Sequence, residues 1–123
     1  MTSLQQLTTH ELMDDQVAAA MLAAATRAHA YVKDIPFELF VEDVKLQDAV
    51  AGCVLVTALA QRDLSEQLIN WVDAPWFQLA EGAEWQPNGI RSPAHLRALY
   101  EHVRGVYPRL IEALQRFDDP PTE

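Results

Sequence analysis

Apolar side chains recur along the chain at intervals of three and four residues, and no segment of any length shows the alternation of a β-strand. Thr8 and Glu11 have the spacing of a capping box at the start of a helix. We expect this helix to stop near Asp34, because Pro36 disfavours helical backbone in the residue before it. Its alanine-rich apolar face comprises Leu12, Val17, Met21, Ala24, Ala28, Tyr31 and Val32.

A second long helix is predicted from about Asp43 to Arg62, and its apolar surface is unusually broad. We expect two faces of this helix to need covering by other parts of the protein. The side chains predicted to be buried are Val44, Val50, Val54, Leu55, Ala58 and Leu59.

The second half of the chain predicts shorter helices, one loop and a final long helix. Short helices are expected at Ser65 to Trp71 and at Pro75 to Ala80, the latter with proline at the first helical position. Residues 82–93 hold two prolines and an Asn-Gly pair, which indicates a loop. Ser92 and Pro93 have the pattern of a helix cap and first residue, and Pro108 should bend the helix that follows. The apolar seam of this helix is Leu96, Leu99, Tyr100, Val103, Tyr107, Leu110, Ile111 and Leu114.

Length and charge restrict the fold class and the partners. We predict an all-α protein in which residues 1–123 form one domain, with flexible ends at 1–8 and 118–123. Nine Lys and Arg residues stand against eighteen Asp and Glu, for a formal net charge of −9. Extended binding to nucleic acid or to an anionic membrane is therefore not expected, because neutralising phosphates needs clustered cations. A small local site on RNA stays open.

Targeting signals and cysteine usage favour a cytoplasmic location. Residues 1–12 show no basic region followed by an apolar core, so we predict no signal peptide. The uncharged apolar stretch from Ala49 to Ala60 is too short to span a bilayer, and no membrane partner is expected. The single cysteine, Cys53, has no partner for a disulfide and is interpreted as an inert buried thiol.

Several motifs resemble a known family. Tyr31-Val32-Lys33, Phe37-Glu38-x-Phe40-x-Glu42-Asp43, Gln47-Asp48-Ala49-Val50, Leu64-Ser65-Glu66, Ala74-Pro75-Trp76 and Tyr107-Pro108-x-Leu110 occur in this order. Together they resemble the HepT-like branch of the HEPN superfamily, the toxin subunits of HEPN/MNT toxin–antitoxin pairs, over about residues 12 to 117. The resemblance implies a HEPN-like four- to five-helix bundle that forms a homodimer.

The same resemblance implies that the catalytic chemistry has been lost. The ribonucleases of this branch use R-x-x-x-x-H-x-Y, in which arginine holds the scissile phosphate, histidine moves a proton and the tyrosine accepts adenylylation from the MNT antitoxin. Alignment from Trp76 places Ala83, Asn88 and Ile90 at these positions. Asparagine cannot exchange a proton near neutral pH. We therefore expect neither ribonuclease activity nor adenylylation, and no cofactor.

A second departure concerns the cleft between family protomers. The polar run that faces this cleft is replaced here by Gly52, Cys53, Leu55 and Leu59. Each leucine that is fully buried adds roughly 1.5–3 kcal/mol. We expect a dry dimer surface or, alternatively, a pocket for an apolar small molecule.

Two further groups of residues could be read as a catalytic pair and as a metal site. Arg97 and His102 also satisfy R-x-x-x-x-H, but residues five apart on a helix point about 140° away from each other. We interpret them as solvated helix residues and keep an active HEPN ribonuclease with this relocated pair as an alternative. Acidic residues near His10, namely Glu11, Asp14 and Asp15, are explained by the helix dipole, so no metal site is predicted.

Recognition is assigned to the degenerate loop, while Trp76 is interpreted as a core anchor. Trp85, Gln86, Asn88 and Arg91 offer an aromatic face, amides and one positive charge, a mixture that suits a protein partner. The equal alternative is that Trp85 folds back to cap the core. The sequence thus predicts a non-catalytic HepT-like protein of a toxin–antitoxin or defence lineage, acting through dimerisation and contacts with an MNT nucleotidyltransferase or another protein.

Overall fold

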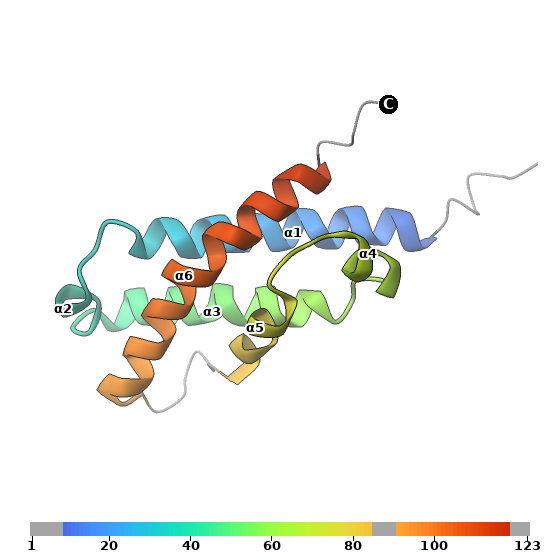
Figure 1. The fold of residues 1–123 in the computed structure, drawn as a ribbon. Helices are drawn as coiled ribbons and strands as arrows, with labels where there is room; N and C mark the ends of the chain where they lie inside the picture. The colour runs from blue at the N-terminus through green and yellow to red at the C-terminus, as the bar shows by residue number, and fades with distance from the viewer. Residues whose placement is uncertain (1–8, 85–90, 119–123) are drawn as a thin grey trace, which may run out of the picture.

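The computed structural model describes residues 9–84 and 91–118, and within these ranges the protein is all-α with no strand (Figure 1). The predicted fold class is therefore confirmed at the level of secondary structure. Thr8, the termini 1–8 and 119–123, and residues 85–90 lie outside the described residues. The elements are α1 (Thr9–Val32), α2 (Phe37–Phe40), α3 (Val44–Gln61), α4 (Glu66–Trp71), α5 (Trp76–Ala80), the 3₁₀ helix η1 (Glu81–Glu84) and α6 (Pro93–Asp118).

Three long helices, α1, α3 and α6, form the body of the molecule. Helix α1 packs along α3, and α6 crosses both of them diagonally and packs mainly against α1 (Figure 1). Met21 of α1, Val50 and Val54 of α3, and Leu99 of α6 are completely buried. The small side chains Ala25 and Ala28 are also fully buried and allow α1 to approach its neighbours closely. The four- to five-helix bundle of the prediction is thus three main helices with shorter ones packed on them.

Helix α3 is covered on two faces, as its broad apolar surface predicted. Helix α1 covers one face, and α5 with η1 covers another. Gly82 of η1 lies so close to α3 that an added Cβ would stand 2.7 Å from Cγ1 of Val54. Glycine at this position therefore allows η1 to pack directly against the α3 backbone and side chains.

Polar side chains at the helix starts follow the sequence signals. Asp43 caps α3 by accepting a hydrogen bond from Leu46 N at 3.0 Å, and Ser92 caps α6 by accepting one from His95 N at 3.1 Å. Pro75 precedes α5 as its cap residue instead of occupying the first helical position. Helix α6 is continuous through Pro108 and includes Asp118, which the sequence assigned to a flexible tail.

Two predictions of burial on α3 were wrong. Val44 is 63% exposed and Leu59 is 40% exposed, so no other described element covers either side chain fully. Helix α3 has the length and apolar composition of a segment that could cross a membrane, as core helices of soluble proteins also have. The helix is longer than the uncharged apolar stretch within it, Ala49 to Ala60.

Candidate functional site

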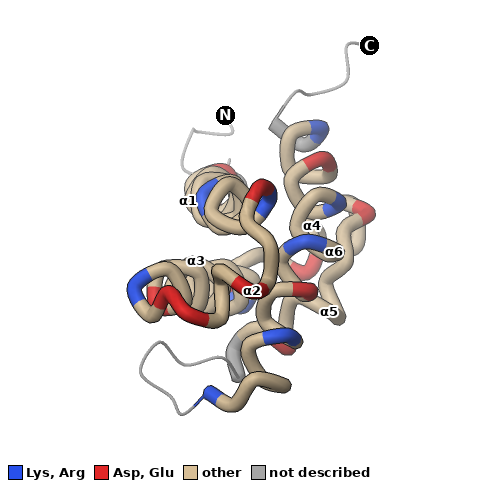
Figure 2. Tube along the Cα trace, turned by 90° about the vertical axis from the view of Figure 1, so that its left-hand side faces the viewer, with Lys and Arg blue, Asp and Glu red and all other residues tan. Residues whose placement is uncertain are grey.

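One side of α3 is turned away from both α1 and α6 (Figure 2). Helical spacing brings a row of small and apolar residues to this side and to its edge beside α1, hereafter the α3 strip: Ala49, Gly52, Leu55, Val56 and Leu59. Val56 is 50% exposed, and an added Cβ at Gly52 would meet no atom within 4 Å. Lys45 stands before the strip and Asp63 after it, and both are exposed. The structure thus leaves an apolar stripe on the helix that otherwise supplies much of the core.

Three of the four residues predicted for the dimer surface lie on the α3 strip, and Cys53 does not. Gly52 and Leu55 are half-buried and Leu59 is exposed. Cys53 is only 7% exposed and belongs to the core. Burial raises the pKa of the Cys53 thiol, and the nearby Arg27 guanidinium partly opposes that shift. The interpretation of a buried thiol is therefore confirmed, whereas its place on a dimer surface is corrected.

A shallow groove of about 360 Å³ runs between α1 and α3 beside the strip. Gly52 and Val56 form part of its α3 wall, and Arg27 and Tyr31 form part of its α1 wall. If the protein binds an apolar small molecule, the alternative predicted from the sequence, that molecule would bind in this groove.

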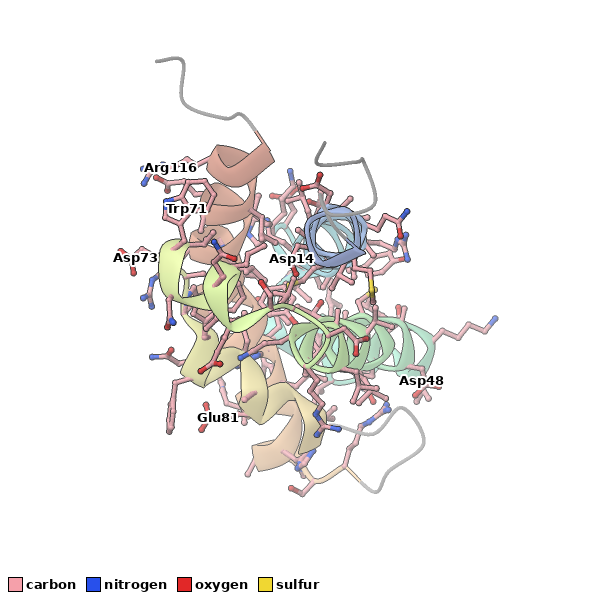
Figure 3. All side chains as sticks on the ribbon, turned by 90° about the vertical axis from the view of Figure 1, so that its right-hand side faces the viewer. Asp14, Asp48, Trp71, Asp73, Glu81 and Arg116 are labelled. Atoms are coloured by element: carbon pink, nitrogen blue, oxygen red, sulfur yellow. The ribbon has the colours of Figure 1, made fainter. Side chains whose placement is uncertain are left out.

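The predicted recognition loop is described only at its end. Trp85, Gln86, Asn88 and Ile90 lie outside the described residues. Arg91 donates to Oδ1 of Asp48 at 2.7 Å, and its side chain is only 9% exposed while that of Asp48 is 46% exposed. This ion pair fixes the start of the α6 segment to the outer side of α3, where Asp48 projects (Figure 3). Arg91 is therefore engaged within the chain.

The structure does not bring Arg97 and His102 together as a catalytic pair. The Arg97 guanidinium lies 4.1 Å from the centroid of the Phe37 ring and 3.6 Å from the carboxylate of Glu101. His102 instead packs edge-on against the Tyr107 ring, with 5.6 Å between the ring centroids. It is buried, not solvated as predicted, and burial lowers its pKa to about 4. A neutral, buried imidazole with this pKa is poorly suited to receive a proton near neutral pH.

Several residues of the family-like motifs hold the fold together around α2. The rings of Phe37 and Phe40 lie 5.4 and 5.3 Å from that of Tyr100, measured between centroids. The Tyr100 hydroxyl donates to the Ile35 carbonyl and accepts from Arg104 at 2.7 Å. Gln47 donates from Nε2 to the carbonyls of Phe40 and Val41 at 2.9 and 3.0 Å. These motif residues therefore have a structural role in this chain.

Asp14 has a role that the sequence did not reveal. Its carboxylate accepts from Ser65 N at 2.9 Å and from Ser65 Oγ at 2.6 Å, and Ser65 Oγ in turn accepts from Leu68 N at 3.1 Å. The carboxylate thus joins α1 to the start of α4, as the central position of Asp14 in Figure 3 illustrates.

In the described part of the chain, no group of three or more His, Cys, Asp or Glu side chains could hold a metal ion.

Trp76 is a core anchor, as predicted. Its Nε1 donates to the carbonyls of Ile69 at 3.1 Å and Val72 at 2.9 Å, and the half-buried ring packs against the core.

Comparison of the chain with protein-family models, with curated proteins and with solved structures gives no match. The resemblance to the HepT-like proteins therefore rests on the sequence motifs alone.

Proposed function

We propose that this protein is a non-catalytic HEPN-like domain of a toxin–antitoxin or defence lineage that acts as a homodimer through protein contacts. The observation that carries this proposal is the α3 strip, where Val56 and Leu59 are 50% and 40% exposed on a helix whose other sides are buried. Contiguous exposed apolar surface of this kind marks contact sites more often than free surface. The degenerate motif at Ala83, Asn88 and Ile90 supports the loss of catalysis.

The order of residues along the strip favours a second copy as its occupant. An antiparallel pairing of two α3 helices about a two-fold axis places residues whose numbers sum to the same value opposite each other. Centred between Gly52 and Val56, this pairing sets Val56 over Gly52 of the partner subunit and Leu59 over Ala49 of the partner subunit. Lys45 then lies near the turn that follows α3 in the partner subunit, which carries Asp63. Large side chains meet small ones and opposite charges meet, which is the complementarity that a two-fold interface requires.

The dimer is tested by sedimentation with single substitutions in the strip. Leu59→Asp introduces a charge that the paired strips would have to desolvate, so we expect this variant to sediment as a monomer where the natural protein is a dimer. Leu39→Asp is the matched control, because Leu39 is 59% exposed on α2 and lies outside the strip. A natural protein that is monomeric at tens of micromolar contradicts the proposal, as does a Leu59→Asp variant that stays dimeric.

Charge reversal tests the antiparallel register independently. Lys45→Asp and Asp63→Lys each place like charges opposite one another in the proposed pairing, and should weaken the dimer. The double variant restores opposite charges and should recover much of the lost affinity. A double variant that is weaker than either single one would contradict this register while leaving another dimer possible.

The loss of catalysis is tested by incubating the pure protein with total RNA, with a defined transfer RNA and with an MNT nucleotidyltransferase plus ATP. We expect neither cleavage nor adenylylation. Cleavage that disappears in Arg97→Ala or His102→Ala would support the relocated pair instead.

A second candidate function, small-molecule binding, is favoured only by the groove between α1 and α3. Its test is a fragment screen by NMR, in which hits must perturb signals of Tyr31 and Val56. Hits that Gly52→Phe abolishes and Gly105→Phe leaves unchanged would establish this function.

A further inference from the structure

The most exposed large apolar side chains in the described part of the chain are aromatic and lie on two adjacent short helices. Phe77 of α5 is 82% exposed and Trp71 of α4 is 69% exposed. We call α4, α5 and the residues between them, 66–80, the α4–α5 corner. It lies on the opposite side of the molecule from Asp48 and the outer side of α3, as Figures 2 and 3 show together. The corner is therefore a surface separate from the α3 strip.

Hydrogen bonds and buried side chains attach the corner to the rest of the molecule. The Trp76 indole bonds to the carbonyls of Ile69 and Val72, which holds α5 against the end of α4. Leu68 of α4 and Leu79 of α5 are 3% and 1% exposed and attach both helices to the core.

An open, shallow groove of about 500 Å³ lies on one face of α4 and is lined by Gln67, Asn70 and Trp71. It thus combines an aromatic wall with two side-chain amides, which can donate and accept hydrogen bonds to a peptide backbone. Tryptophan is over-represented among residues that dominate binding energies.

The segment that forms the corner carries only acidic charge, and the one arginine labelled beside it in Figure 3, Arg116, is paired with Glu112. The segment from Asp63 to Glu81 contains four acidic residues, Asp63, Glu66, Asp73 and Glu81, and no Lys or Arg. All four are exposed, and Asp73 and Glu81 project on the same side as Trp71 in Figure 3. Arg116 reaches this side from α6, where it forms an ion pair with Glu112. The field at the corner therefore favours a cationic ligand over an anionic membrane surface or nucleic acid.

We propose that the α4–α5 corner binds a basic amphipathic peptide segment of another protein. An apolar side chain of that segment packs against Trp71 in the groove, a second apolar contact is made with Phe77, and its Lys or Arg residues face Asp73 and Glu81. The proposal does not depend on dimerisation through the α3 strip.

The test uses the full chain as bait for a displayed library of random peptides, with counter-selection against the immobilisation support alone. We expect selected peptides to be rich in Lys, Arg and large apolar residues. Their affinity for the natural protein should fall about tenfold or more with Trp71→Ala and should decrease as salt is raised. Leu39→Ala, at a side chain 59% exposed on α2, is the matched control and should change nothing.

A second variant separates binding from folding. Asp73→Lys with Glu81→Lys reverses charge at two exposed positions, so the fold should be retained, as circular dichroism can verify, while peptide affinity falls about tenfold at low salt. Selection of no peptides, or of neutral or acidic ones, would overturn the proposal. So would a Trp71→Ala, Phe77→Ala variant that keeps full peptide affinity, or one that turns a dimer into a monomer, because the corner would then bind a second copy.

Discussion

Glycines of the described helices occupy opposite environments, although the sequence alone presents them alike. Gly82 is pressed against Val54 of α3, while Gly105 in the middle of α6 is exposed, and an added Cβ there would meet no atom within 4 Å. Glycine is thus required by close packing at the first position and only lowers helix stability at the second.

Alanine substitution should therefore change stability in opposite directions at these two glycines. Gly82→Ala forces η1 away from α3, because Val54 is fully buried and a β-branched side chain in a helix has little rotamer freedom. We expect it to lower the free energy of unfolding by about 1–3 kcal/mol. Gly105→Ala should raise it by about 0.5–1 kcal/mol. Urea denaturation measures both, and an unchanged midpoint for Gly82→Ala would mean that η1 does not pack as described.

The buried His102 makes stability depend on pH in a defined window. Its pKa is about 4 in the folded protein, below the ordinary 6.5 of histidine, so the unfolded chain binds the proton more tightly. Its contribution is complete above pH 6.5 and is lost as the pH falls towards 4, by about 2 kcal/mol between pH 8 and pH 5. The free energies of unfolding of the natural protein and of His102→Leu, measured by denaturation at pH 8 and pH 5, isolate the contribution of His102. Equal pH dependence of the two proteins would contradict it.

At the scale of the elements, short helices depend on side chains from elsewhere. Helix α4 has six residues, and a helix of this length is not stable alone in water. Its start is held by Ser65, which in turn is held by the Asp14 carboxylate 51 residues earlier in the chain.

Removing this carboxylate should affect α4 before the rest of the molecule. We expect Asp14→Ala to lower the free energy of unfolding by about 2–3 kcal/mol, because the Ser65 donors lose a charged acceptor in a partly buried place. Hydrogen exchange should speed up most at the amides of α4. Asp15→Ala, at the exposed neighbouring position, is the control and should change stability by less than about 0.5 kcal/mol. A uniform increase of exchange along the whole chain would mean that α4 does not open on its own.

At the scale of the whole molecule, a dimer formed through the α3 strip links stability to concentration. Because association stabilises the folded state by mass action, the thermal midpoint of the natural protein should rise as the protein concentration is raised. The midpoint of Leu59→Asp should be independent of concentration. Differential scanning fluorimetry over a hundredfold range of concentration, roughly the span on which such linkage is easily seen, tests both expectations.

The local pattern of residues was enough to predict the all-α class, the three long helices and the cap of the last one at Ser92. These features depend on spacing and on hydrogen bonds within a few residues, so they are visible in the sequence. The sequence also predicted Trp76 as an anchor and most of the buried seam of α6.

Contacts between distant residues were decided only by the tertiary structure. The exposure of Val44 and Leu59, the burial of His102, and the hydrogen bonds from Ser65 to Asp14 depend on which neighbour each helix meets. Periodicity shows that α3 has a broad apolar surface but not which parts α1, α5 and η1 cover. The covered parts became core, and the part left open is the α3 strip, because a helix can bury only the faces against which another element packs.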